Sequence, residues 1–336
     1  MSGSDGNGRA LLQVDDLVVR YPIPRGLSGA VLRRERRFVH AVSGVSLHVD
    51  RGEMVALVGE SGCGKTTTAQ AILRLVDSDS GSVSFDGVDV TGISQSDLRE
   101  LRRRMQIIYQ DPYESLDPRF RVSTTIAEPL LIHKIGSGSE RRVAVDHALE
   151  QVGLAPPELF VERFPHELSG GQRQRVAIAA SLALEPDLLI ADEPVSMLDV
   201  SVRAGILGIL DELRDRGLAV LMITHDLSTA ARFADRICVM YLGRIVEEGP
   251  AREVIESPRH PYTKALLSVV PRRDPRKRVS AQILRGETPN PIDVPSGCRF
   301  HPRCPIAIEA CKESEPELEA AAGRPDHRAA CFLADK

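Results

Sequence analysis

The 336-residue sequence predicts an α/β fold organised around a phosphate-binding loop and followed by a small C-terminal extension. Three observations support this prediction. Apolar strand-like runs alternate with helix-like runs, which is typical of a sheet with helices on its faces. The run GESGCGKTT at residues 59–67 lies between an apolar strand and a helix. Near Gly249-Pro250 the alternation ends, and a proline-rich, basic segment with four cysteines follows.

The glycine-rich run satisfies the pattern G-x-x-x-x-G-K-[ST] at Gly59, Gly64, Lys65 and Thr66. Glycines permit a tight turn whose backbone N–H groups point inward, and these donors hold phosphate oxygens together with the positive end of the helix dipole. Lys65 would reach the β- and γ-phosphates, and the Thr66 hydroxyl would bind Mg²⁺. A chance match arises in about one chain in a hundred of this length. The sequence therefore predicts a nucleoside triphosphate ligand.

Composition excludes several classes of protein. A hydrophobic content of 42% and a charged content of 27% are ordinary for a soluble globular chain, and no apolar run approaches the roughly 18 residues that span a bilayer. The first ten residues lack the apolar core of a secretion signal and are expected to form a flexible tail. The net charge of −4, the absence of Trp and the 4% aromatic content argue against a general nucleic-acid binder.

Hydrophobic periodicity predicts the individual elements. Strands are expected at residues 11–20, 42–49, 54–58, 82–90, 105–109, 187–191 and 218–224. The strand at 82–90 includes a turn at Asp86-Gly87, and residues 22–37 are expected to form a surface loop or small insertion. Helices are expected at residues 68–75, 96–104, 126–160 with a break at 135–139, 168–184 and 204–216. Ser96 is the expected N-cap of its helix, and Ser169 with Gln172 forms an S-x-x-Q capping box. The basic face of helix 96–104 is either a solvated surface or a contact for an acidic partner.

Two further groups of residues complete a phosphoryl-transfer site. Asp192 and Glu193 end an apolar strand, so Asp192 is expected to hold Mg²⁺ while Glu193 stays available as a general base. Ser169, Gly170 and Gly171 open a helix with exposed N–H groups, which predicts a second anion-binding end. Taken alone, Asp192 and Glu193 also fit two acidic residues at the end of a strand. Ser169, Gly170 and Gly171 taken alone also fit a well-capped helix.

The segment LSGGQ at residues 168–172 resembles the signature of ABC ATPases. The phosphate loop, Gln110, the strand ending in Asp192 and Glu193, SMLD at residues 196–199 and His225 stand in the order of that family. The resemblance implies an ABC-type nucleotide-binding domain at residues 11–250, with a mixed-sheet core, an antiparallel β subdomain and a helical subdomain at about 111–184. Residues 1–10 would form the tail and residues 251–336 the extension.

The resemblance also implies roles for single residues. Glu193, His225 and Gln110 would be catalytic, and Thr66, Gln110 and Asp192 would bind Mg²⁺. His225 would contact the γ-phosphate, and Asp199 would bridge to the opposite subunit. Ser169 and Gly171 would cap a nucleotide held by that subunit. ATP would be bound by Tyr21, which stacks on adenine, and by Gly59, Ser61, Gly62, Cys63, Gly64, Lys65, Thr66, Thr67, Asp192, Ser169, Gly170, Gly171, Gln172 and Asp199.

Three longer segments resemble the ATPases of oligopeptide and dipeptide importers, and are closest to the second of their paired subunits. They are QDPYESLDPRF at 110–120, EPVSMLDVSVRAGIL at 193–207 and SPRHPYTKALL at 257–267. The resemblance implies ATP-driven peptide import from the cytoplasmic face of the membrane, with a second ATPase subunit, two permeases and an extracytoplasmic substrate-binding protein. Nickel and glutathione importers share these features, and a soluble ABC ATPase acting on DNA or ribosomes is the less favoured alternative.

The tail cysteines Cys298, Cys304, Cys311 and Cys331 have the spacing C-x5-C-x6-C-x19-C. Four thiols in a short segment indicate a metal ion or a cluster. The gaps are wider than the C-x₂₋₄-C pairs of most zinc sites. The resemblance to peptide-importer ATPases favours a [4Fe–4S] cluster, while zinc and plain reduced thiols stay open.

Overall fold

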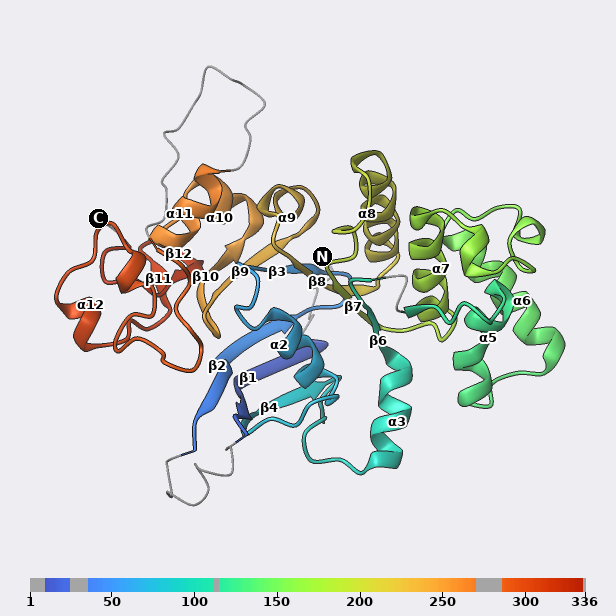
Figure 1. Ribbon diagram of the computed structural model, residues 1–336, viewed down its shortest axis with the longest axis horizontal. Coiled ribbons are helices and arrows are strands. Elements are labelled where there is room, and N and C mark those ends of the chain that lie inside the picture. Colours follow the sequence, from blue (N-terminus) through green and yellow to red (C-terminus); the bar gives the residue numbers. More distant parts are fainter. Residues whose placement is uncertain (1–9, 25–35, 112–114, 270–285, 335–336) are drawn as a thin grey trace, which may run out of the picture. The chain divides into compact units, whose positions relative to one another are not determined.

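The computed structural model describes residues 10–24, 36–111, 115–269 and 286–334. The chain forms two compact units (Figure 1). The first contains Met1–His48, Val55–Gly92 and Thr224–Lys336, and the second contains Val49–Met54 and Ile93–Ile223. No helix in the described ranges has both the length and the apolar character needed to cross a membrane. The domain boundaries expected from the sequence remain predictions.

An antiparallel sheet of the first unit has the strand order β2-β1-β4-β5. Its strands are β1 (Leu12–Pro22), β2 (Phe38–Val49), β4 (Ser80–Phe85) and β5 (Val88–Asp89). Asp86 and Gly87 join β4 to β5 with φ angles of 50° and 79°, and two positive φ angles are what a tight hairpin turn needs. This confirms the turn predicted at this Asp-Gly pair. Most of the predicted loop at 22–37 lies outside the described residues.

A second group of strands in this unit follows the order β11-β12-β10-β9-β3. These are β11 (Glu319–Ala321), β12 (Arg324–Ala329), β10 (Arg244–Pro250), β9 (Arg236–Tyr241) and β3 (Met54–Val58). β3 runs parallel to β9, whereas β10 and β12 pair antiparallel. Every residue of β3 is buried, as its continuous apolar run predicts. The segment after Pro250 therefore adds two strands to the sheet, which the sequence patterns did not predict.

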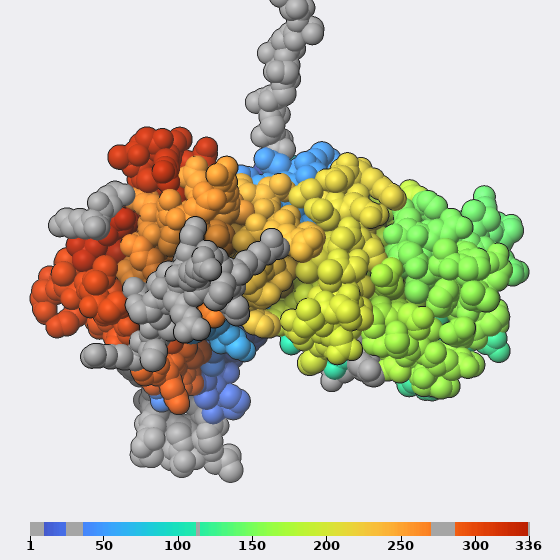
Figure 2. All heavy atoms as spheres, turned by 90° about the horizontal axis from the view of Figure 1, so that it is seen from above, coloured from blue at the N-terminus to red at the C-terminus, as the bar shows by residue number. Residues whose placement is uncertain are grey.

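Short helices complete the described part of the first unit. They are α2 (Lys65–Ile72), α9 (Leu227–Phe233), α10 (Ala251–Glu256), α11 (Pro261–Ser268), α12 (Ala310–Glu313) and the 3₁₀ turn η3 (His301–Arg303). Helix α10 packs on β9 and β10. Helix α2 packs against β1 (Figure 1). It begins three residues before the predicted start at Thr68, because the phosphate-loop lysine is already helical. The described C-terminal residues are the orange and red atoms on the left of Figure 2.

The described residues of the second unit form three parallel strands in the order β8-β7-β6. They are β6 (Met105–Ile108), β7 (Leu188–Asp192) and β8 (Ala219–Thr224), and β7 and β8 are buried throughout. Its helices are α3 (Gln95–Arg104), α5 (Val122–Ile132), α6 (Gly138–Gln151), α7 (Gly170–Leu182) and α8 (Val200–Asp215), with 3₁₀ turns η1 (Pro157–Leu159) and η2 (Pro165–Glu167). Helices α5, α6 and α7 pack on one another and form the green body in Figure 2.

The helix starts test the capping predictions. The capping box of Ser169 and Gln172 is present at α7, as expected. The prediction of Ser96 as an N-cap is wrong: Ser94 caps α3, and its hydroxyl accepts a hydrogen bond from the Asp97 N–H. Two serines within three residues offered the same capping chemistry, and the extended backbone at Ser94 makes it the cap.

Candidate functional site

The phosphate loop follows β3 and is tightly enclosed by its own unit. A Cβ on Gly59 would lie 2.2 Å from the Met240 carbonyl oxygen, on β9. A Cβ on Gly64 would lie 2.2 Å from the Ala41 carbonyl oxygen, on β2, and Gly64 has a φ of +108°. Both positions therefore require glycine, because any side chain would overlap backbone atoms. The loop conformation is fixed by packing on two sides.

Lys65 lies along this loop. Its side chain is buried, and its Nζ donates to the carbonyl oxygens of Gly59 and Glu60 at 2.8 and 3.0 Å. Ser61, Gly62 and Thr66 are exposed, and no side chain caps the N-terminus of α2. The first N–H groups of a helix have no partner within that helix. An exposed, uncapped helix start beside a lysine suits the binding of an anion.

In the second unit, acidic residues lie where a parallel strand ends. Asp192 is the last residue of β7 and is 3% exposed. Glu193 leaves the strand with a φ of 47°, and its N–H donates to the Ile223 carbonyl oxygen at 2.9 Å. Gln110 follows β6, whose Ile108 is in register with Ala191 of β7. Gln110, Asp192 and Glu193 therefore follow the same edge of the parallel strands, where α/β proteins bind ligands.

The signature segment forms the start of α7. The Ser169 hydroxyl accepts from the Gln172 N–H at 3.3 Å, and the Gln172 side chain accepts from the Ser169 N–H at 3.0 Å. Ser169 is exposed, whereas Gly171 is buried. A Cβ on Gly171 would lie 2.4 Å from a methyl group of Val202, on α8. The glycine thus lets two helices approach closely while the capped helix end faces outward.

The remaining predicted residues lie at the ends of elements. Tyr21 is half-buried near the end of β1, exposed His225 follows β8, and exposed Asp199 is the N-cap of α8. The first unit holds Tyr21, Gly59, Ser61, Gly62, Cys63, Gly64, Lys65, Thr66, Thr67 and His225. The second holds Gln110, Ser169, Gly170, Gly171, Gln172, Asp192, Glu193 and Asp199. Each unit therefore carries part of the predicted site, and the role of each residue stays a prediction.

Comparison with known proteins identifies the family. The profile of the ABC transporter family matches residues 42–196, and that of the oligopeptide/dipeptide transporter C-terminal region matches residues 246–311. The chain is 49% identical to a Brucella ovis protein named as a peptide import ATP-binding protein, over 86% of this chain and 90% of that protein. The chain belongs to the ABC ATPase family.

Two further comparisons concern almost the full length of the chain and its fold. The oligopeptide transport ATP-binding protein AppF of Bacillus subtilis is 43% identical, over 97% of this chain and 98% of AppF. Among solved structures, a dimeric ATP-binding cassette in a post-hydrolysis state with ADP and Pi superimposes with a TM-score of 0.62. It is 29% identical and covers 72% of this chain and 99% of its own. These matches confirm the predicted ABC-type fold and the resemblance to peptide-importer ATPases.

The four tail cysteines of this ABC ATPase lie around one small cavity, which Cys298, Cys304, Cys311 and Cys331 line together. All four are free thiols. Burial raises the pKa of Cys298 to about 11, and the neighbouring thiols add to the shift. In the described part of the chain, no three His, Cys, Asp or Glu side chains are arranged to hold a metal ion. The four thiols therefore share one cavity without forming a preset metal site.

Glu60 is a loop residue whose contacts the sequence patterns missed. Arg303 binds its carboxylate with both terminal nitrogens, and Thr288 donates to the same group. Both residues come from the C-terminal region, more than 200 positions along the chain. The only signal in the sequence was a carboxylate inside a loop that binds phosphate. That signal does not name a partner.

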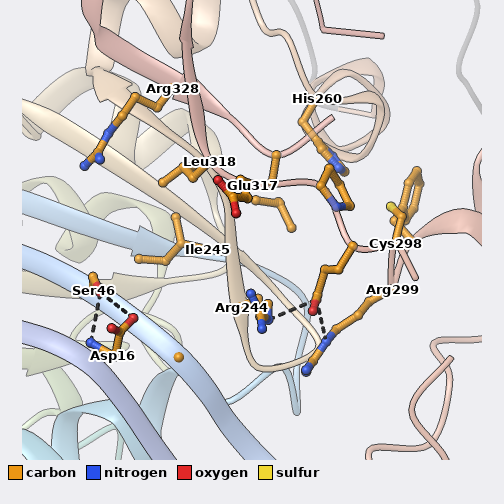
Figure 3. Close-up of a pocket in the computed structure, with 16 residues that line it drawn as sticks. Asp16, Ser46, Arg244, Ile245, His260, Cys298, Arg299, Glu317, Leu318 and Arg328 are labelled. Carbon is orange, nitrogen blue, oxygen red and sulfur yellow. Dashed lines mark hydrogen bonds and ion pairs between the residues drawn. The ribbon is translucent and has the colours of Figure 1, made fainter. Parts of the chain in front are cut away.

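A cavity of about 440 Å³ also lies in the first unit (Figure 3). Arg244 and Arg299 both reach Glu315, at 2.9 and 3.2 Å, and the Asp16 N–H donates to the Ser46 hydroxyl at 2.9 Å. The described residues that line the cavity include none of those predicted to bind nucleotide. Glu315 is thus shared by two arginines of the cavity lining.

Proposed function

We propose that this chain is the ATP-hydrolysing subunit of a transporter that imports peptides across the cytoplasmic membrane, bound to the membrane's cytoplasmic face. The observation that carries the proposal is the combination of a phosphate loop with the C-terminal region of oligopeptide/dipeptide transporters in one chain. Relatives named as peptide import and oligopeptide transport ATP-binding proteins match over most of their length. Di- and oligopeptides are therefore the proposed cargo.

The proposed mechanism divides each ATP site between two subunits. Lys65 and the N–H groups at the start of α2 would hold the phosphates, with Thr66, Asp192 and Gln110 around Mg²⁺. Ser169 and Gly171 of the opposite subunit would stabilise charge on the far side of the γ-phosphate, which one phosphate loop leaves open. Glu193 would act as the general base on water. ATP would thus join two subunits, and hydrolysis would release them.

The remaining proposed roles belong to side chains near the nucleotide. Tyr21 would stack on adenine, His225 would contact the γ-phosphate, and Asp199 would bridge to the partner. The proposed assembly contains a second ATPase subunit, two permeases and an extracytoplasmic substrate-binding protein. The segment after Gln110 would contact a permease. Arg119 belongs to this segment and is exposed, with its guanidinium bound to Asp117 at 2.6 Å.

Reconstitution tests this function. The chain would be purified with its permeases and second ATPase, placed in liposomes, and supplied with the binding protein and a labelled tripeptide. We expect uptake that needs ATP and is lost in Lys65→Met. Charge reversal at Arg119, or at Glu114, which lies outside the described residues, should leave ATP hydrolysis intact and reduce uptake. Uptake of nickel or glutathione in place of peptides would overturn the proposed cargo.

We also propose that the four tail thiols bind a [4Fe–4S] cluster, with zinc as the alternative ligand and reduced thiols as the outcome without metal. The support is the four-cysteine donor set, which matches the ligands of such clusters, and its convergence on one cavity. The cluster would cross-link a segment with few apolar residues. Anaerobically purified protein should contain about four iron and four sulfide per chain, with a visible charge-transfer band. Colourless protein with one zinc, or with no metal, would contradict the cluster.

A further inference from the structure

Three groups of the C-terminal region hold the second residue of the phosphate loop. The Arg303 guanidinium binds the Glu60 carboxylate through both terminal nitrogens, at 2.8 and 3.1 Å. The Thr288 hydroxyl donates to the same carboxylate at 2.7 Å. The Glu60 N–H donates to the Tyr262 hydroxyl at 2.9 Å. The extension thus fixes both the side chain and the backbone of one loop residue.

The arginine itself is rigidly held. Its side chain is 8% exposed, and its guanidinium lies 5.8 Å from the centre of the Tyr241 ring. Tyr241 packs on Tyr262 and Phe300 with ring centroids 4.7 and 5.3 Å apart, and all three rings are buried. A planar guanidinium that stacks on an aromatic ring and binds a carboxylate with two parallel bonds loses little freedom on pairing. The pairing of Arg303 with Glu60 is therefore preorganised by the buried aromatic residues around the arginine.

The charge of the Glu60 side chain explains why its pairing with Arg303 matters to the phosphate loop. Burial alone would raise the pKa of Glu60, but the bonds from Arg303 and Thr288 outweigh burial and lower it. Glu60 is therefore a carboxylate at neutral pH, and it stands in a loop that must accept a triphosphate. Lys65 already donates to the Glu60 carbonyl oxygen. A carboxylate without Arg303 would repel the phosphates and compete with them for the lysine.

We propose that Arg303 is a positioning residue for ATP binding: it neutralises Glu60 and so keeps Lys65 available to the phosphates. The C-terminal region then contributes directly to the ATP site of its own chain. The inference rests on the proposed role of Lys65 at the β- and γ-phosphates.

A double-mutant cycle on the full chain tests the inference. Arg303→Met keeps much of the apolar stem over Tyr241 and removes the charge. We expect it to weaken ATP binding about tenfold, which corresponds to about 1.4 kcal/mol, because the unpaired Glu60 carboxylate would then oppose the phosphates. In the Glu60→Gln background the same substitution should change ATP affinity by less than about twofold. Arg303→Lys should restore part of the loss.

Controls separate this role from a loss of folding. Arg299→Met removes a half-buried arginine from the same segment. That arginine pairs with Glu315 and donates to the Leu242 carbonyl oxygen, and neither contact is with a residue of the phosphate loop, so ATP affinity should stay at the parental value. Thr288→Val removes one hydrogen bond to the same carboxylate, so it should also weaken ATP binding, but less than Arg303→Met does. All variants would be compared by thermal unfolding.

Each outcome decides the inference. Arg303→Met with parental affinity overturns it, and so does a double variant that binds as weakly as Arg303→Met alone, because the arginine would then act through the fold and not through Glu60. Lys65→Met distinguishes failure of the inference from failure of the proposed function. If that variant still binds ATP like the parent, the proposed role of the phosphate loop is itself wrong.

Discussion

Two helix starts in this chain use the same physics in opposite ways. Helix α2 begins at the phosphate loop without a side-chain cap, and Gly64 at its start is enclosed by backbone atoms. Helix α7 begins at the signature with a complete capping box, and its Ser169 is exposed. Both present N–H groups and the positive end of a helix dipole. They differ in what holds them in place.

This difference between α2 and α7 indicates whether one subunit or two are needed to form each anion-binding site. The phosphate loop depends on β2, β9 and the C-terminal region of its own chain, so one folded subunit can present it fully formed. The signature is stabilised within four consecutive residues and leaves its outward side for another molecule. Substitutions in the loop should therefore change ATP binding by the single chain. Substitutions in the signature should change ATP hydrolysis only when two subunits meet.

The largest expected effect tests whether both helix starts serve one reaction. Glu193→Gln removes the proposed base, so turnover of the assembled transporter should fall by about 10²–10⁴-fold, while both helix starts stay intact. ATP should remain bound, and the ATPase pair should become more stable. ATP turnover would be measured in an assay stopped at fixed times. The amount of paired subunit would be measured by size-exclusion chromatography. Parental turnover would remove Glu193 from the base role.

The next effect concerns the enclosure of the loop. Gly64→Ala would place a Cβ 2.2 Å from the Ala41 carbonyl oxygen and would strain a positive φ. We expect a loss of about 3 kcal/mol in the free energy of unfolding, together with loss of ATP binding. Gly62→Ala is the matched control, because Gly62 has a φ of +77° but nothing within 4 Å of its Cβ. Equal losses for the two variants would show that the enclosure contributes nothing.

Local sequence patterns predicted those parts of the fold that local forces decide. Strand β3 matches its prediction at both ends, because five consecutive apolar residues are all buried. The capping box of α7 was also correct, since both its hydrogen bonds join residues three positions apart. The prediction that Ser96 is the N-cap was wrong, because Ser94 offers the same hydroxyl and the backbone conformation decides which serine caps the helix.

Contacts between distant residues were beyond the reach of these patterns. Strand β12 has the sequence RPDHRA, which shows no apolar alternation, and only His327 and Ala329 are buried in it. Its place in the sheet comes from pairing with β10. The pairing of Glu60 with Arg303 spans 243 positions, and neither residue indicates the other. The family resemblance supplied the function, whereas the structure supplied this connection.

A smaller effect is expected at the signature. Ser169→Ala removes the N-cap hydroxyl and should lower the free energy of unfolding by about 1 kcal/mol. ATP binding by the separate chain should not change, because the proposed partner of Ser169 is a nucleotide on another subunit. Hydrolysis by the assembled pair should fall well beyond what the stability loss explains. Weaker ATP binding by the isolated variant would contradict the contrast between the two helix starts.

The smallest effect is a pH dependence that only the phosphate loop should show. Because the pKa of Glu60 in the folded chain is lowered from 4.5, the unfolded chain binds the proton more readily. The carboxylate therefore stabilises the fold above about pH 4.5, and that contribution is lost as the pH falls through the lower, folded pKa. Partial exposure keeps it below about 1 kcal/mol.

Chemical denaturation from pH 3 to 6 would measure this difference. The gap in unfolding free energy between the parent and Glu60→Gln should close as the pH falls. The gap for Ser169→Ala should stay constant, because the capping box of α7 joins a hydroxyl and an amide and neither titrates in this range. If the difference in unfolding free energy for Glu60→Gln also stays constant with pH, the Arg303 pair does not stabilise the loop. The two helix starts would then differ in packing alone.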